Sequence, residues 1–101
     1  MREKLPARRR CENSTMRWMG MAIEVQLGFY DDGRIGEVFL STTKSGTAID
    51  TNCRDLALVT SIALQYGCPL KTIADAATRD GMGRPEGLAA TLFQHIEEMM
   101  K

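Results

Sequence analysis

Three consecutive arginines, Arg8, Arg9 and Arg10, stand near the start of the chain. Guanidinium groups bind phosphate and carboxylate through paired hydrogen bonds, so such a run could contact a nucleic acid or an acidic partner. Residues 1–18 hold six cationic and two acidic side chains, a net charge of +4, and residues 19–101 carry −4. We therefore expect a basic, flexible tail on an acidic body, either solvated or contacting phosphates or a partner.

Two further segments have residue types suited to an anion. Lys44, Ser45 and Gly46 form a polar loop ahead of an expected helix, where backbone N–H groups bind phosphate. This loop lacks the G-x-x-x-x-G-K-[ST] pattern of a P-loop. Arg79 and Arg84 flank a glycine-containing loop ahead of another helix. The structural alternatives are a solvated turn in the first loop, and in the second an Arg79 that caps the preceding helix beside a solvated Arg84.

Thiol and metal chemistry has fewer candidates. Cys11, Cys53 and Cys68 show no C-x-x-C spacing, so neither a disulfide framework nor a zinc site is indicated. Cys68 precedes a helix expected to start at Pro69, where the helix dipole favours a thiolate, so a redox role is the alternative to packing. His95 is the single histidine, which argues against a two-histidine metal site. We expect no catalytic residue, metal or cofactor in this chain.

The elements that position these residues follow from periodicity and turn residues. Apolar and polar residues alternate over 21–29, which predicts a half-buried strand. Asp31-Asp32-Gly33 predicts a turn, and branched and aromatic residues over 35–41 predict a second strand. Together these features predict an antiparallel β-hairpin over residues 19–41.

Helices must cover this hairpin, because a two-stranded ribbon is marginal in water. The first expected helix is apolar nearly all round, so we place it at the centre of the core. Gly67 and Pro69 predict a tight corner into the second helix, and Pro85 opens the third. The helices are expected over residues 50–66, 69–79 and 85–100. The fold class is α+β, in one small domain of residues 19–101.

Size and composition limit the functions available. A chain of 101 residues forms one modest core and has no room for a large catalytic barrel. No apolar run approaches the roughly 18 residues of a membrane span, and the basic start is followed by polar residues rather than by the apolar segment of a secretory signal. We expect a soluble, cytoplasmic protein.

Two stretches resemble a known family. Asp32–Leu40 in the hairpin and Leu64–Leu70 at the helix corner resemble the C-terminal accessory module, of the TSCPD type, of cobalamin-dependent ribonucleotide reductases, which also occurs as free-standing short proteins. With the Lys44–Gly46 loop, the resemblance covers about residues 20–85. It implies a connection with ribonucleotide reduction and deoxyribonucleotide supply for DNA synthesis, with a reductase catalytic chain or a nucleotide as partner. Arg34, within the first stretch, joins the candidate ligand-binding residues.

The sequence departs from the whole reductases in its chemistry. The radical-bearing cysteine, the reducing cysteine pair, the cobalamin-contacting regions and a C-terminal C-x-x-C are all missing from it. The resemblance therefore implies a module without turnover of its own that binds a nucleotide or a protein. The alternatives are a nucleic-acid-associated protein using Arg8–Arg10 and a thiol enzyme using Cys53 and Cys68. A homodimer is a further expectation, because the hairpin has an unpaired strand edge at which a second copy can pair.

Overall fold

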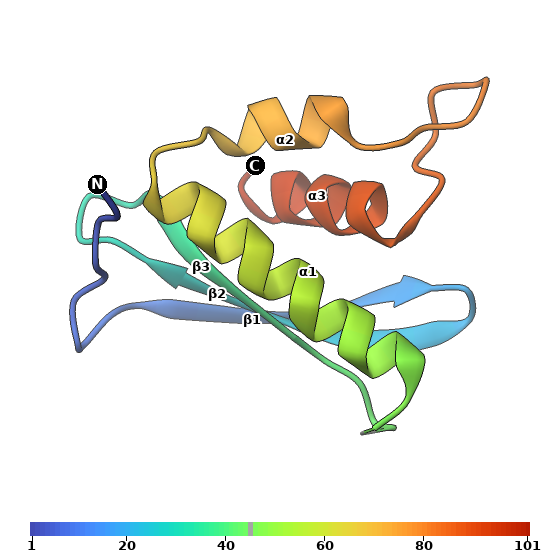
Figure 1. Cartoon of the computed structure of the whole chain (residues 1–101), viewed down its shortest axis with the longest axis horizontal. Helices are drawn as coiled ribbons and strands as arrows, with labels where there is room; N and C mark the ends of the chain where they lie inside the picture. Colours follow the sequence, from blue (N-terminus) through green and yellow to red (C-terminus); the bar gives the residue numbers. More distant parts are fainter. Residues whose placement is uncertain (45) are drawn as a thin grey trace. The chain divides into compact units, whose positions relative to one another are not determined.

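The computed structural model describes residues 1–44 and 46–101. The chain forms two compact units, Met1–Gly67 and Cys68–Lys101. The first contains a sheet and helix α1, the second helices α2 and α3, and the α+β class is confirmed (Figure 1). The elements are β1 (Cys11–Trp18), β2 (Met21–Phe29), β3 (Ile35–Ser41), α1 (Ala48–Gln65), α2 (Leu70–Ala76) and α3 (Leu88–Met99).

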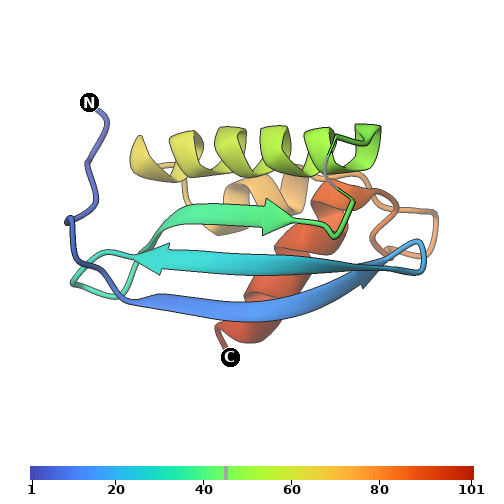
Figure 2. The ribbon, with the colours of Figure 1, turned by 90° about the horizontal axis from the view of Figure 1, so that it is seen from below.

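The sheet has three antiparallel strands in the order β1-β2-β3, so the expected two-stranded hairpin was incomplete (Figure 2). The added strand β1 lies within residues 1–18, which the sequence analysis assigned to a basic tail. It pairs with β2 from Cys11 opposite Gly28 to Trp18 opposite Met21. Its pattern was hard to recognise because Met16 is the one fully buried side chain among the residues of β1.

One face of the sheet is buried and the other faces solvent. The predicted alternation in β2 is confirmed, since Ile23, Val25 and Leu27 are at most 1% exposed while Glu24 is exposed. Leu40 lies opposite Val25 in β3 and is also buried. The outer face therefore carries the alternate residues of each strand, which are mostly polar.

Helix α1 lies alongside β3 and bonds to its edge (Figure 2). The Ser61 hydroxyl donates to the Val38 carbonyl at 3.1 Å and accepts from the Val38 N–H at 2.8 Å. One turn further on, the Gln65 side-chain amide donates to the Gly36 carbonyl at 2.9 Å. Because an unpaired strand edge invites pairing with other chains, these two side chains protect β3.

The first helix begins and ends close to its predicted bounds. Thr47 caps its start, with its hydroxyl accepting from the Asp50 N–H at 3.2 Å. Gly67 follows the C-cap residue Tyr66 with a φ of 93°, which confirms that the helix ends at this glycine.

The other two helices are shorter than the sequence predicted. Helix α2 ends at Ala76 instead of residue 79, because Ala77 adopts an extended backbone with φ −68° and ψ 147°. Helix α3 begins at Leu88 rather than at Pro85, because Pro85 forms an isolated antiparallel bridge with Arg79. The segment between these two helices is therefore a loop held by its own pairing.

Asp50, in the first turn of α1, is a buried acid whose charge is stabilised by hydrogen bonds. Its carboxylate accepts from the Arg54 guanidinium at 2.9 Å and from the Thr42 hydroxyl at 3.0 Å. These two groups, Arg54 foremost, lower the pKa of Asp50 below its ordinary value. The ionised carboxylate thus contributes stability above the unfolded pKa of about 3.9, and this contribution disappears as pH falls through the folded pKa.

We expect Asp50→Asn to be less stable than the parent at pH 7 and to lose less stability on acidification to pH 2. Urea unfolding at pH steps between 2 and 7 measures both effects. Asp55→Asn, at an exposed position of the same helix, is the control and should follow the parent curve. Equal acid dependence of the parent and Asp50→Asn would contradict this account of Asp50.

Candidate functional site

The ten residues before β1 are fastened to the Met1–Gly67 unit at several points. The Glu3 N–H donates to the Gln65 carbonyl at 2.8 Å, which joins the start of the unit to the end of α1. The Tyr30 hydroxyl donates to the Glu3 carbonyl at 2.6 Å. Burial raises the pKa of Tyr30, so its hydroxyl keeps the proton that it donates. The arginines that follow Glu3 in the sequence are therefore held near the turn between β2 and β3.

Arg34, a candidate ligand contact, has several partners within the protein. Its two terminal nitrogens donate to the Glu3 carboxylate at 3.0 Å each, and Nε donates to Asp32 at 2.8 Å. Its guanidinium also lies 4.6 Å from the centre of the Tyr30 ring. The two carboxylates raise the pKa of Arg34. Arg34 thus fastens the N-terminal segment to the β2–β3 turn, and ligand binding by this residue stays a prediction.

The arginine run divides into paired and unpaired side chains. Arg9 forms two parallel hydrogen bonds with Glu37, at 2.9 and 3.0 Å, and the contact with this carboxylate raises the pKa of Arg9. Arg10 pairs with Glu12 at 2.9 Å and lies 4.0 Å over the Phe29 ring. Arg8 is exposed and has no hydrogen-bond or ion-pair partner among residues 1–44 and 46–101. Of the three, Arg8 is the arginine whose guanidinium is available to a ligand.

The three arginines line one open depression of about 680 Å³ on the outer face of the sheet. Gln26 and Phe39 contribute from neighbouring positions of β2 and β3, since their Cα atoms are register partners. We call this depression the arginine depression. Its lining comprises Ala7, Arg8, Arg9, Arg10, Cys11, Gln26, Asp31, Glu37 and Phe39.

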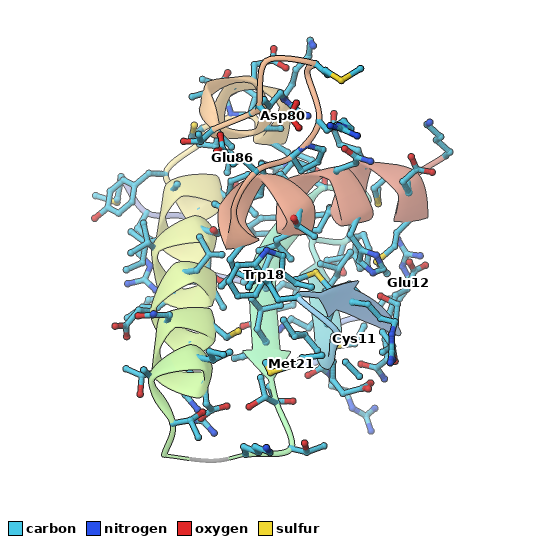
Figure 3. All side chains as sticks on the ribbon, turned by 90° about the vertical axis from the view of Figure 1, so that its right-hand side faces the viewer. Cys11, Glu12, Trp18, Met21, Asp80 and Glu86 are labelled. Carbon is cyan, nitrogen blue, oxygen red and sulfur yellow. The ribbon has the colours of Figure 1, made fainter. Side chains whose placement is uncertain are left out.

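Gly28 explains how Glu37 reaches Arg9. A Cβ atom at Gly28 would lie 2.6 Å from Oε1 of Glu37, so the Glu37 side chain occupies the space above this glycine. Cys11 is the register partner of Gly28 on the other side and starts β1 (Figure 3). The Arg9–Glu37 pair therefore lies against the sheet and forms one wall of the arginine depression.

Sequence reasoning identified the arginines but missed Gln26 and Phe39. A signal for Phe39 was present in the sequence. In β3 the buried residues alternate as Val38 and Leu40, which leaves Phe39 on the solvent side, where it is 52% exposed. Phe39 is a large aromatic residue at a strand position where the alternation predicts a polar side chain. Such a residue calls for a functional explanation.

Lys44 lies at a different depression, of about 470 Å³. Lys44 and three threonines line it together with the turn between β1 and β2. The Thr47 hydroxyl donates to the Lys44 carbonyl at 2.8 Å, so Lys44 is held at the start of α1. Ser45 lies outside the described residues. Anion binding by Lys44 and Gly46 stays a prediction.

The Arg79–Arg84 loop, in the Cys68–Lys101 unit, is organised by Asp80 (Figure 3). The Asp80 carboxylate accepts from the N–H groups of Met82 and Arg84 at 2.9 and 3.0 Å, and from Nε of Arg84 at 3.0 Å. The N–H groups of Arg84 and Met82 lower the pKa of Asp80. Arg79 donates to the Gly83 carbonyl at 3.4 Å rather than capping α2. Both arginines thus have partners within the loop, and ligand binding there stays a prediction.

The thiols lie in two different settings. Cys53 is fully buried in α1, and burial raises the pKa of its thiol, which keeps it protonated and unreactive. The Cys68 sulfur lies 3.7 Å from the Pro69 carbonyl, ahead of the short helix α2. Within residues 1–44 and 46–101, no group of three or more His, Cys, Asp and Glu side chains is placed to hold a metal ion.

A second candidate surface lies on the outward side of α1. Leu58, Val59 and Tyr66 are 57%, 64% and 61% exposed, and Ile62 lies between them on the same side of the helix. This corrects the expectation that a helix apolar nearly all round would be buried at the centre of the core. Leu58 also lines a groove of about 380 Å³ between α1 and β3, which it shares with Phe39. We call the side formed by Leu58, Val59, Ile62 and Tyr66 the apolar face of α1.

The three-stranded sheet bonded to α1, with a second unit of two helices, defines a small α+β module with two solvent-facing candidate surfaces. The chain belongs to the TSCPD domain family, whose model matches residues 2–100. This confirms the resemblance found in the sequence. Among the described residues, no helix is both long enough and apolar enough to cross a membrane.

The chain is similar to segments of vitamin B12-dependent ribonucleotide reductases. It is 39% identical to the enzyme of Bradyrhizobium diazoefficiens and 38% identical to that of Agrobacterium fabrum, over 77 residues in each case. These matches cover 76% of the chain but 6% of each reductase. The enzyme of Rhodopirellula baltica is 35% identical over 74 residues, which cover 73% of the chain and 7% of the reductase. No solved structure matches.

Proposed function

We propose that this protein is an accessory module of ribonucleotide reduction that binds the reductase catalytic chain and has no turnover of its own. The observation that carries the proposal is the match of 76% of this chain to 6% of the reductase's length. A segment of that size is one small part of a large enzyme. The module would then act in the cytoplasm, in deoxyribonucleotide supply for DNA synthesis.

The apolar face of α1 is the surface we assign to the reductase. Its exposed Leu58 and Val59 lie on a regular helix and Tyr66 caps the end of that helix, so together they present a defined apolar surface to a partner. Contiguous apolar surface on a small soluble protein marks an interaction site, because leaving it in water is unfavourable. In the reductases the matching segment is covalently part of the same long chain. Contact through the apolar face of α1 would be non-covalent and saturable.

The full chain should bind the vitamin B12-dependent reductase of Agrobacterium fabrum saturably, as measured by calorimetry. Val59→Glu places a charge in the middle of the apolar face and should weaken binding at least about tenfold, because burying an unpaired carboxylate is costly. Asn52→Glu introduces the same charge two turns away, at an exposed position of α1, and should bind as the parent does.

Two outcomes would contradict the proposal. One is the absence of saturable binding to the reductase, and the other is equal weakening by both substitutions. A second copy of the chain would be a competing occupant of the apolar face, and light scattering on the free chain tests for such a dimer. A dimer that Val59→Glu dissociates would assign the apolar face to a second copy of the chain instead of the reductase.

The alternative function, nucleic-acid association through Arg8–Arg10, has less support from the contacts. Arg9 and Arg10 are already paired with Glu37 and Glu12, so the run offers fewer uncompensated charges than its sequence suggests. The whole chain also has a formal net charge of zero. Binding to polyanions depends on the number of phosphates neutralised, so this arrangement favours the reductase proposal.

A further inference from the structure

We propose that the arginine depression binds a nucleotide with one phosphate group, with the base against Phe39 and the phosphate at Arg8. This site adjoins the apolar face of α1, because Phe39 shares a groove with Leu58, and binding of a nucleotide there goes beyond binding of the reductase. The residues that carry the inference come from the N-terminal segment and from the outer sides of β2 and β3.

Phe39 supplies a platform for an aromatic base. It is 52% exposed in the middle of β3, between the buried Val38 and Leu40, so the strand fixes its position while one side of the ring meets solvent. Stacking on an exposed aromatic ring is a general way to bind a base, because every base has a π-face. Gln26 is the register partner of Phe39 on β2 and lines the same depression. Its amide can donate to and accept from the edge of a base.

The charges of the lining favour a single phosphate. Three arginines and two carboxylates, Asp31 and Glu37, line the depression. Arg9 is paired with Glu37 and Arg10 with Glu12, so Arg8 is the lining arginine whose guanidinium has no ion-pair partner among the described residues. A phosphate accepts two parallel hydrogen bonds from a guanidinium. One such guanidinium matches a single phosphate group rather than a row of them.

The dimensions and the supports of the depression also suit a nucleotide. Its volume of about 680 Å³ falls within the range of roughly 300–1,000 Å³ found for small-molecule sites. The wall formed by Arg9 and Glu37 lies over Gly28, where no side chain competes for the space. Phe29 N–H donates to the Arg10 carbonyl at 3.0 Å, which ties the arginine run to the end of the sheet. The wall and the backbone of the arginine run are therefore in place before a ligand arrives.

Titration of the ¹⁵N-labelled full chain with AMP, followed by NMR, tests the inference. We expect saturable shifts at Arg8, Gln26 and Phe39, and weaker binding of both adenosine and ribose 5-phosphate, because each lacks one of the two recognised groups. Phe39→Leu keeps an apolar side chain but removes the ring, and should weaken AMP binding about tenfold. Arg8→Gln should weaken it about threefold, since the guanidinium is exposed to solvent.

Arg17→Gln is the matched control. Arg17 is exposed on the outer face of β1, where its register partner is Ala22, near the opposite end of that strand from Cys11. It should leave AMP binding unchanged. Absence of saturable binding, or equal weakening by Arg17→Gln and Arg8→Gln, would overturn the nucleotide site.

A single-stranded oligonucleotide completes the experiment. If it binds far more tightly than AMP, with an affinity that falls steeply with salt, the surface is a nucleic-acid interface and the mononucleotide inference is wrong. Reductase binding by Arg8→Gln, at a position outside the groove that Phe39 shares with Leu58, separates this inference from the proposed function. Weaker AMP binding with reductase binding retained is the expected result for Arg8→Gln, and failure of the reductase to bind the parent chain leaves the AMP titration unaffected.

Discussion

Replacing Gly36 with alanine is expected to lower the free energy of unfolding by about 2 kcal/mol. A Cβ atom at this position would lie 2.5 Å from Cε2 of Tyr30 and 2.9 Å from Cδ2 of Leu5. Both side chains must then move, and Tyr30 is held by the hydrogen bond from its hydroxyl to Glu3. The clash outweighs the gain of roughly 0.4–1 kcal/mol that alanine brings by restricting the unfolded chain. Urea unfolding followed by circular dichroism measures the difference.

Gly81→Ala is the control for this substitution. A Cβ atom at Gly81 meets no atom within 4 Å, so the same chemical change should leave stability within about 0.5 kcal/mol of the parent. Gly36→Ala should also increase amide exchange at Glu3, because its clash lies beneath the segment that Tyr30 fastens. A Gly36→Ala variant as stable as Gly81→Ala would show that Tyr30 and Leu5 yield without cost.

Removal of the Ser61 hydroxyl is expected to cost about 2 kcal/mol of stability. The hydroxyl serves both the N–H and the carbonyl of Val38, and Ser61 itself is 8% exposed. Ser61→Ala leaves these two backbone groups without a partner in a setting that water reaches poorly. The loss exceeds the helix propensity that alanine gains, about 0.5 kcal/mol. Denaturant unfolding gives the total, and hydrogen exchange at Val38 localises it.

Thr51→Ala removes a hydroxyl from an exposed position of the same helix and should change stability by less than about 0.5 kcal/mol. Faster exchange at Val38 is expected in Ser61→Ala alone. If Val38 exchanges at the same rate in both variants, the contact between α1 and β3 does not protect the strand edge.

The sequence predicted those elements whose local pattern agrees with their final environment. β2 alternates over residues 22–27 and is buried on one face there, and Gly67 takes the positive φ expected of a residue that ends a helix. β1 was missed because its pairing with β2 is long-range information, and its own residues are mostly polar. The sequence led us to expect too much of α1 to be buried. The apolar pattern shows which side chains are apolar, but it does not show which of them pack against another helix or strand.

The candidate site, like the fold, was predictable from the sequence only in part. Arg8, Arg9 and Arg10 were recognisable as a run, but the state of Arg9 depends on a contact far away in sequence. Arg9 meets Glu37 across 28 positions. The residues around Arg9 do not indicate such a pair, so the sequence cannot show that Arg9 is already engaged. Phe39 could have been found from the phase of β3, because an aromatic residue interrupts the polar series of that strand.

The hydrogen bond from Glu3 to Gln65 brings together the two ends of the Met1–Gly67 unit. A unit whose ends are adjacent can be joined to a longer polypeptide through neighbouring points without distorting its interior, as insertions and circular permutations of other domains illustrate. Its sheet, α1 and the candidate surfaces they bear would then be carried intact from one protein context to another. The two points at which further chain can join this unit therefore lie next to each other.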